Sequence, residues 1–299
     1  MTLVARGQRI PDVLNGTVCT REEFLESIAL LARTYTPRDR AALPGIDAGR
    51  ADIILAGALI IEQIIIGLNI RKLTLSAFAL REGIVFDTVQ QQRDIREFHH
   101  LSRLRYDTVY NLCELYRVNL PHAGHVRSLA LLLFDDLQHI HLLGDKEREL
   151  LEAAALLHDV GYHVSPDQHH KHGYYIILHC VMPGFTNDEA ELIANIARYH
   201  RKSHPKRKHE NFLALSPAKQ RVVELAAGIL RIAEGLDRRQ QQLAASVRAI
   251  DDGAAIRLII TPARQDAPPD IELWGAIRRK GLLEEILGRK ITVLIDNPA

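Results

Sequence analysis

The sequence predicts a mainly helical protein, with a mixed α/β piece before the helical region and a small α/β piece after it. From about residue 91 to residue 243, apolar residues recur at helical spacing with few strand signals. Short runs typical of strands lie mostly outside that region. The composition is 47% hydrophobic and 25% charged over 299 residues, which is that of a globular protein with two domains rather than one.

The first 90 residues are expected to mix helices and strands. Thr20 followed by Glu23 is a capping-box pattern, so an amphipathic helix is expected to begin there. Pro44 and Gly45 mark a loop, and residues 73–78 are typical of a short strand.

Residues 53–68 form the most apolar stretch of the chain. Glu62 and Gln63 lie in its middle, and it falls short of the roughly 20 residues that a membrane span requires. The stretch is therefore expected to be a buried helix rather than a membrane anchor.

A domain boundary is expected between residues 87 and 93, where the mixed pattern gives way to long amphipathic helices. These helices are expected to begin at Pro121, at Asn187 after a capping box, and at Pro217 after Ser216. The division is 1–90, 91–243 and 244–299. The last part is predicted to contain strands at 246–250, 255–260 and 291–295, a loop at 261–269 and a helix at 270–287.

Composition limits the classes of partner. The formal net charge is +1, so the chain as a whole has no electrostatic attraction for nucleic acid or a membrane surface. Its three cysteines are odd in number and lack the spacing of metal ligands, which favours a reducing compartment such as the cytoplasm. No signal peptide is visible at the N-terminus.

The adjacent residues His158 and Asp159, at the end of an apolar helix, are the most informative pair. Burying an imidazole beside a carboxylate is costly unless a partner compensates both groups, and a divalent metal is a common partner. We therefore ask whether other ligands converge on this pair.

Helical spacing brings further candidates inward. His122 lies four residues before the apolar Val126, and Asp237 lies four residues after Ala233. His200 ends the apolar stripe of the helix from Asn187, and His169 shares a face with Ile176 and Ile177. Read singly, an inward histidine is more often a satisfied core residue, and an inward aspartate is often paired with arginine. Convergence favours a metal bound by His122, His158, Asp159 and Asp237, with His169 and His200 beside them.

The donor set indicates the kind of metal. Histidine nitrogens with carboxylate oxygens, and no thiolates, suit Mn, Mg, Fe, Co or Zn in a catalytic site rather than a structural zinc site. Such a metal generates hydroxide from bound water and polarises a phosphoryl oxygen.

Basic residues follow His200, in residues 198–209. Alone, this run is a solvated loop as readily as a binding surface. Its place beside His200 favours phosphate binding by Arg198, Arg201 and Lys202. With only Tyr199 to offer a stacking face, a nucleic-acid surface is disfavoured.

Longer runs around these residues resemble the helical C-terminal domain of the Ppx/GppA family, the exopolyphosphatases and guanosine pentaphosphate phosphohydrolases. That domain belongs to the HD superfamily of metal-dependent phosphohydrolases. The runs are 156–163 (LLHDVGYH), 169–175 (HHKHGYY), 183–185 (PGF), 196–202 (IARYHRK) and 230–237 (LRIAEGLD). Gly173 stands where the family pattern has serine.

Upstream, residues 50–58 (RADIILAGA) and 79–83 (ALREG) resemble the end of the family's actin-like (ASKHA) phosphatase module. The two glycine-rich phosphate loops of that module have no counterpart here. The chain is therefore expected to be a C-terminal fragment or a shortened relative, and the family's polyphosphate-hydrolysing site does not map onto it.

The resemblance implies a phosphohydrolase with His158 and Asp159 as catalytic residues, a metal on His122, His158, Asp159 and Asp237, and a second metal on His169 and His200. It implies polyphosphate or a phosphorylated nucleotide as the ligand. A homodimer is also implied, and the apolar tail helix with Ile271 and Trp274 favours it. The alternatives are a non-catalytic module that binds polyphosphate or nucleotide and supports dimerisation, and a cyclic-nucleotide phosphodiesterase.

Overall fold

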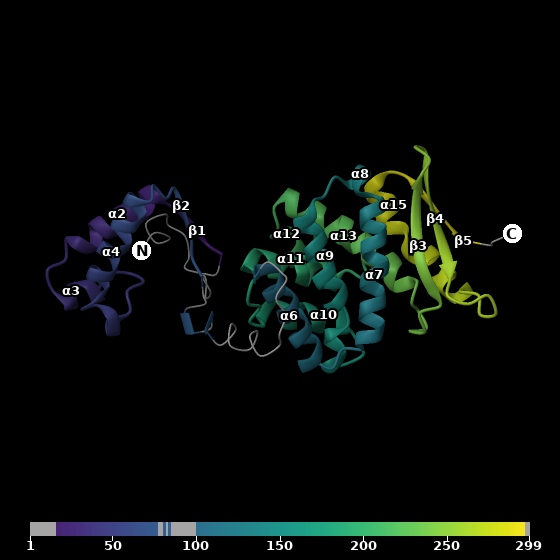
Figure 1. The fold of residues 1–299 in the computed structure, drawn as a ribbon, viewed down its shortest axis with the longest axis horizontal. Coiled ribbons are helices and arrows are strands. Elements are labelled where there is room, and N and C mark those ends of the chain that lie inside the picture. Colours follow the sequence, from purple (N-terminus) through teal and green to yellow (C-terminus); the bar gives the residue numbers. More distant parts are fainter. Residues whose placement is uncertain (1–15, 77–79, 82, 85–99, 297–299) are drawn as a thin grey trace. The chain divides into compact units, whose positions relative to one another are not determined.

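A computed structural model of the chain describes residues 16–76, 80–81, 83–84 and 100–296 (Figure 1). The chain divides into two compact units, residues 1–97 and 98–299. The boundary expected between residues 87 and 93 lies outside the described residues. The tail, predicted as a separate segment, belongs to the second unit, and the three-part division stays a prediction.

The first unit combines a two-stranded sheet with helices. β1 (Val18–Thr20) pairs antiparallel with β2 (Lys72–Thr74), which covers only the start of the strand expected at 73–78; residues 77–79 are outside the described part. α2 (Arg21–Ala32) begins at the predicted capping box. The Thr20 side chain accepts from the backbone N–H of Glu23, and the Glu23 carboxylate accepts from the Thr20 N–H. The remaining elements are α3 (Pro37–Ala41), η1 (Ala48–Arg50) and α4 (Ile54–Gly67).

The apolar stretch at 53–68 is a helix as predicted, but the expectation that it is buried is wrong. Only Ile65 is buried within α4, where the helix packs against α2. Ile54 and Leu55 are half-buried, and the remaining large apolar side chains of the stretch are exposed: Ile53, Leu59, Ile60, Ile61, Ile64, Ile66 and Leu68. An apolar sequence allows a helix to be buried, but whether the helix is buried depends on the elements that pack against it. None of the described helices is long and apolar enough to cross a membrane.

The second unit is mainly helical, as predicted. Its helices up to the tail are α6 (His100–Leu115), α7 (Leu120–Asp136), α8 (Gln138–His141), α9 (Asp145–Leu157), η2 (Val160–His163), α10 (His169–His179), α11 (Asn187–Arg198), α12 (Glu210–Leu213) and α13 (Pro217–Gly235). The helix starts predicted at Pro121, Asn187 and Pro217 are confirmed. α9 packs against α7, α11 and α13, and these helices enclose one apolar core.

The tail forms a three-stranded sheet backed by two helices (Figure 1). β4 (Ala255–Pro262) lies between β3 (Ala244–Asp251), which is antiparallel to it, and β5 (Lys290–Ile295), which is parallel. The single helix predicted at 270–287 is wrong, because the segment forms α14 (Asp270–Arg279) and α15 (Gly281–Leu287). The break falls at Lys280, directly before the helix-weakening Gly281.

Candidate metal centre

The pair singled out in the sequence lies where α9 ends. His158 follows the last helical residue and is fully buried, and Asp159 precedes the short helix η2 with 14% of its side chain exposed. Next to it, Gly161 lies against the first turn of α10: a Cβ at this position would be 2.5 Å from the backbone nitrogen of Gly173. This close approach brings His169, the first residue of α10, to Asp159.

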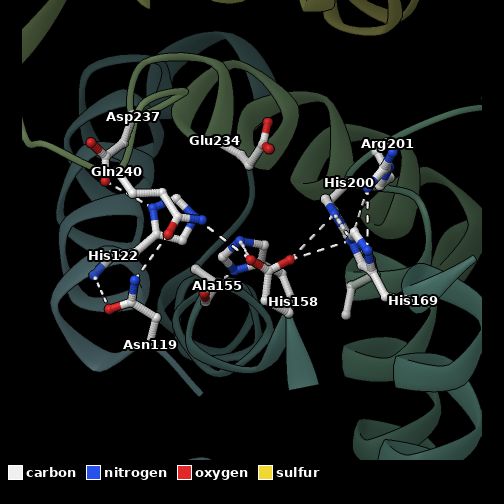
Figure 2. Close-up of polar contacts among 12 residues, drawn as sticks. Asn119, His122, Ala155, His158, His169, His200, Arg201, Glu234, Asp237 and Gln240 are labelled. Atoms are coloured by element: carbon white, nitrogen blue, oxygen red, sulfur yellow. Dashed lines mark hydrogen bonds and ion pairs between the residues drawn. The ribbon is translucent and has the colours of Figure 1, made fainter. Parts of the chain in front are cut away.

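Four histidines from separate parts of the fold surround the Asp159 carboxylate (Figure 2). Its Oδ2 lies 3.7 Å from Nε2 of His122 and 3.5 Å from Nε2 of His158. Its Oδ1 lies 3.3 Å from Nε2 of His169 and 3.9 Å from Nε2 of His200. All four rings therefore present the same nitrogen to one carboxylate.

Backbone carbonyls fix the orientation of three of these rings. Nδ1 of His158 lies 2.7 Å from the carbonyl oxygen of Ala155. Nδ1 of His169 lies 3.1 Å from that of Pro166, and Nδ1 of His200 lies 2.6 Å from that of Ala197. Because a carbonyl only accepts, each Nδ1 carries the proton and donates it. In a neutral ring, Nε2 then keeps its lone pair and faces Asp159.

One of these lone pairs lacks a donor, that of His158, and the lone pair of His169 faces only Nη1 of Arg201, at 3.2 Å. Nε2 of His169 and Nε2 of His200 lie 3.3 Å apart, so two acceptors face each other. No hydrogen bond from the described residues reaches the buried Nε2 of His158. A buried acceptor without a donor is unfavourable, and a cation between the rings and the carboxylate removes that cost. The residues present thus fit a metal.

His122 is held by a carboxylate instead of a carbonyl. Its Nδ1 lies 2.8 Å from Oδ2 of the fully buried Asp237, whose Oδ1 accepts from the backbone N–H of Gln242 at 2.7 Å. Asp237 therefore aims Nε2 of His122 at Asp159, in the manner of carboxylates that orient metal-bound histidines.

Among the described residues, two sets of side chains have the geometry to hold an ion, and both contain Asp159. One set is His122, His158 and Asp159, and the other is Asp159, His169 and His200. The structure thus brings together five of the six predicted ligands, and it places Asp237 behind His122. Direct ligation by Asp237 stays a prediction.

Burial favours the neutral form of three site histidines. Loss of solvent lowers the pKa of His158 and of His169, with the charge of Asp159 opposing the change, and it lowers the pKa of His200 further. A neutral imidazole is the form that binds metal.

The three predicted phosphate-binding cations differ in their surroundings. Nη1 of Arg201 lies 3.2 Å from both ring nitrogens of His169, at the edge of the site. Arg198 stacks instead over the rings of Tyr174 and Tyr199. Lys202 is exposed, with a φ of +59°. Phosphate binding by Arg198 and Lys202 stays a prediction.

Sequence reasoning did not identify several residues near the site. Tyr162 stacks on the ring of His169, with 3.9 Å between ring centroids. Glu234 of α13 is drawn in Figure 2, and Arg279 of α14 forms an ion pair with this glutamate. Glu234 is three residues before Asp237 on the helical pattern, a spacing that could have indicated it. No local pattern marks Arg279.

Family models match residues in both units. Residues 104–265 match the model of the Ppx/GppA phosphatase domain III, and residues 4–92 match that of the Ppx/GppA phosphatase family.

Curated relatives carry the name guanosine-5'-triphosphate,3'-diphosphate pyrophosphatase. The protein from Pseudoalteromonas translucida is 29% identical over 253 residues, covering 79% of this chain and 48% of its own. That from Pseudoalteromonas atlantica is 31% identical over 184 residues, covering 60% of this chain and 35% of its own. The Aeromonas salmonicida protein is 32% identical over 157 residues, covering 52% and 30%.

The chain therefore spans about half or less of the length of these relatives. The domain III match alone covers more than half of the chain and contains every residue of the two ligand sets. By this match, the chain belongs to the Ppx/GppA phosphatase family.

Proposed function

We propose that the chain is a metal-dependent phosphohydrolase of the HD type, which cleaves phosphoanhydride or phosphoester bonds at the His158–Asp159 site. The observation that carries this proposal is the arrangement of four histidine Nε2 atoms around one carboxylate, among which the buried Nε2 of His158 receives no hydrogen bond from the described residues. A divalent ion bound there supplies a hydroxide nucleophile and a Lewis acid for a phosphoryl oxygen.

Each residue has a role that follows from its contacts. His122 and His158 would hold one ion and His169 and His200 a second, and Asp159 belongs to both ligand sets. Asp237 orients His122, and Arg201 neutralises the charge of the phosphoryl group. Nitrogen and oxygen donors suit Mn, Mg, Fe, Co or Zn.

The substrate is proposed from the relatives' names, which specify a phosphorylated guanosine. A phosphorylated nucleotide or polyphosphate fits a site with two cations and an arginine at its edge. We further propose that residues 91–243 form the HD domain, that residues 1–90 end an actin-like module, and that the protein acts in the cytoplasm.

A homodimer also belongs to this proposal. Three apolar side chains of α14, Ile271, Trp274 and Ile277, are each more than two-fifths exposed. They give one helix face on which a second copy can pack. A monomeric mass in solution would contradict the dimer.

The second candidate is a non-catalytic module, in which the same site binds nucleotide or polyphosphate. The length of the relatives favours this candidate, because the activity in their name belongs to chains about twice as long as the segment that matches this chain.

The experiment measures phosphate release from guanosine-5'-triphosphate,3'-diphosphate and from polyphosphate by the Mn-loaded protein. We expect activity that falls more than about 100-fold in His158→Ala, because even outer partners of metal ligands change activity ~10–100-fold. The exposed His179, which ends α10 and lies outside both ligand sets, provides the control His179→Ala. Nucleotide binding without release would favour the second candidate, and absence of metal binding would contradict both the ion roles and the catalytic proposal.

A further inference from the structure

The tail reaches the candidate site through a close crossing of two helices. α14 packs against α13 at Gly235 and Gly275: a Cβ on Gly235 would lie 2.8 Å from the carbonyl carbon of Gly275. Only glycines allow the two backbones to approach this far. The crossing lies next to Asp237, so α14 passes beside the part of α13 that lines the site.

Arg279, at the end of α14, forms an ion pair with Glu234 on α13. Each of these side chains is only 15% exposed. In Figure 2, Glu234 lies between the His122–Asp237 pair and the group of His200, His169 and Arg201. The guanidinium of Arg279 is close enough for its charge to act on His158 of the first ligand set and on His200 of the second.

The electrostatic surroundings agree with this position. The charge of Arg279 lowers the pKa of both His158 and His200, and the charge of Asp159 raises the pKa of Arg279. Burial lowers the pKa of Arg279 to about 10, so the group remains a cation at neutral pH.

Arg279 has donors to spare. A guanidinium carries five N–H groups. Among the described residues, Glu234 is the sole charged group that forms an ion pair with Arg279, and the Arg279 guanidinium makes no hydrogen bond to a backbone carbonyl. Arg231, the other buried arginine of this region, donates to the carbonyls of Tyr199 and Lys202. A buried arginine with unused donors beside a metal-type site is suited to an oxyanion.

We propose that Arg279 binds a phosphate oxygen of the ligand in the candidate site, opposite Arg201, and that Glu234 pairs with it while the site has no ligand. The tail thereby contributes a binding residue to the helical site. This inference rests on the proposed function, because the bound phosphate is the group that the metals would also contact.

The competing explanation is that the ion pair only fastens α14 to α13. A second pair already fastens α14 to the turn that follows α13, since Arg239 binds Glu272 of α14 through two nitrogens, at 3.0 and 2.6 Å. Arg239 and Glu272 lie outside both ligand sets, whereas Glu234 lies between them.

The test measures binding of inorganic phosphate to Mn-loaded, desalted protein by titration calorimetry, together with Mn content. In Arg279→Gln we expect at least about a 10-fold loss of phosphate affinity with unchanged Mn content, since hydrogen bonds to charged groups are strong. Arg278→Gln is the matched control: it removes the same charge from the next residue, which is exposed and stacks on Trp274, and we expect less than about a two-fold change.

Arg279→Gln leaves Glu234 buried without its partner and can unfold the protein. The double variant Glu234→Gln/Arg279→Gln removes both charges with little change of shape, and it should bind phosphate as weakly as the single variant. Wild-type affinity in a folded Arg279 variant that binds Mn overturns this inference and leaves the proposed function standing. A wild type that binds no Mn overturns the proposed function, and the inference with it.

Discussion

The contact between Gly161 and α10 gives the sharpest mutational prediction, because it sets the distance between His169 and Asp159. In Gly161→Ala, the new Cβ would lie 2.5 Å from the Gly173 nitrogen and 2.8 Å from the His169 carbonyl carbon. Both partners are backbone atoms, so no side chain can rotate away. The first turn of α10 must move instead.

The size of that movement follows from the distances. Ordinary contacts of a Cβ begin at 3.4 Å, so the 2.5 Å contact must lengthen by about 0.9 Å, and the still closer contact with the His169 carbonyl oxygen must lengthen by more. Metal–ligand distances tolerate only about 0.2 Å. A shift of this size moves His169 out of the second set and leaves His122, His158 and Asp159 unaffected. Overpacking of this kind also costs about 1–3 kcal/mol of unfolding free energy.

The assay is Mn content per chain together with the free energy of unfolding in urea. We expect Gly161→Ala to bind one ion where the wild type binds two. Gly173→Ala is the control on the facing glycine, where a Cβ would make ordinary contacts of 3.5 Å or more. Two ions bound by a folded Gly161→Ala variant would refute the proposed role of this contact.

Three further predictions concern other parts of the molecule. Asp237→Asn should weaken Mn binding ~10–100-fold at the first set, because the amide orients His122 less firmly; calorimetry with unchanged affinity would contradict this. Burial lowers the pKa of His141 from its ordinary value of 6.5. As pH falls below 6.5, the imidazole of the unfolded chain is therefore protonated before that of the folded chain, and the free energy of unfolding decreases. The unfolding free energy of the wild type should then fall more steeply with acid than that of His141→Gln, by up to about 1.4 kcal/mol per pH unit, and equal slopes would exclude the effect. On α4, Ile65→Ala should lower the free energy of unfolding by about 2–5 kcal/mol and Ile60→Ala by less than about 0.5 kcal/mol. Equal decreases in urea unfolding would contradict the exposure of the Ile60 side chain.

Local rules predicted helix starts in both units. The capping boxes at Thr20 and Thr186 place helix starts because their partners lie three residues away in the same chain. The inward positions of His122 and His200 followed from helical spacing alone, since each continues an apolar stripe.

Other features depend on what lies across from a residue, which spacing does not contain. The apolar face of α4 is exposed because α2 covers only the side with Ile65. Arg279 comes from a helix more than 100 residues from His158 in the sequence, and only the glycine crossing of α13 and α14 brings it to the site. The backbone carbonyls that set the histidine tautomers are likewise visible only in the fold.

The central claim is that Asp159 is shared by two metal ions. The most direct test is the number of Mn ions bound per chain, counted by calorimetry in the wild type and in Asp159→Asn. We predict two ions in the wild type and a severe loss of both in the variant, because both ligand sets contain this carboxylate. A wild type that binds no Mn, or an Asp159→Asn variant that binds two ions with wild-type affinity, would contradict the claim.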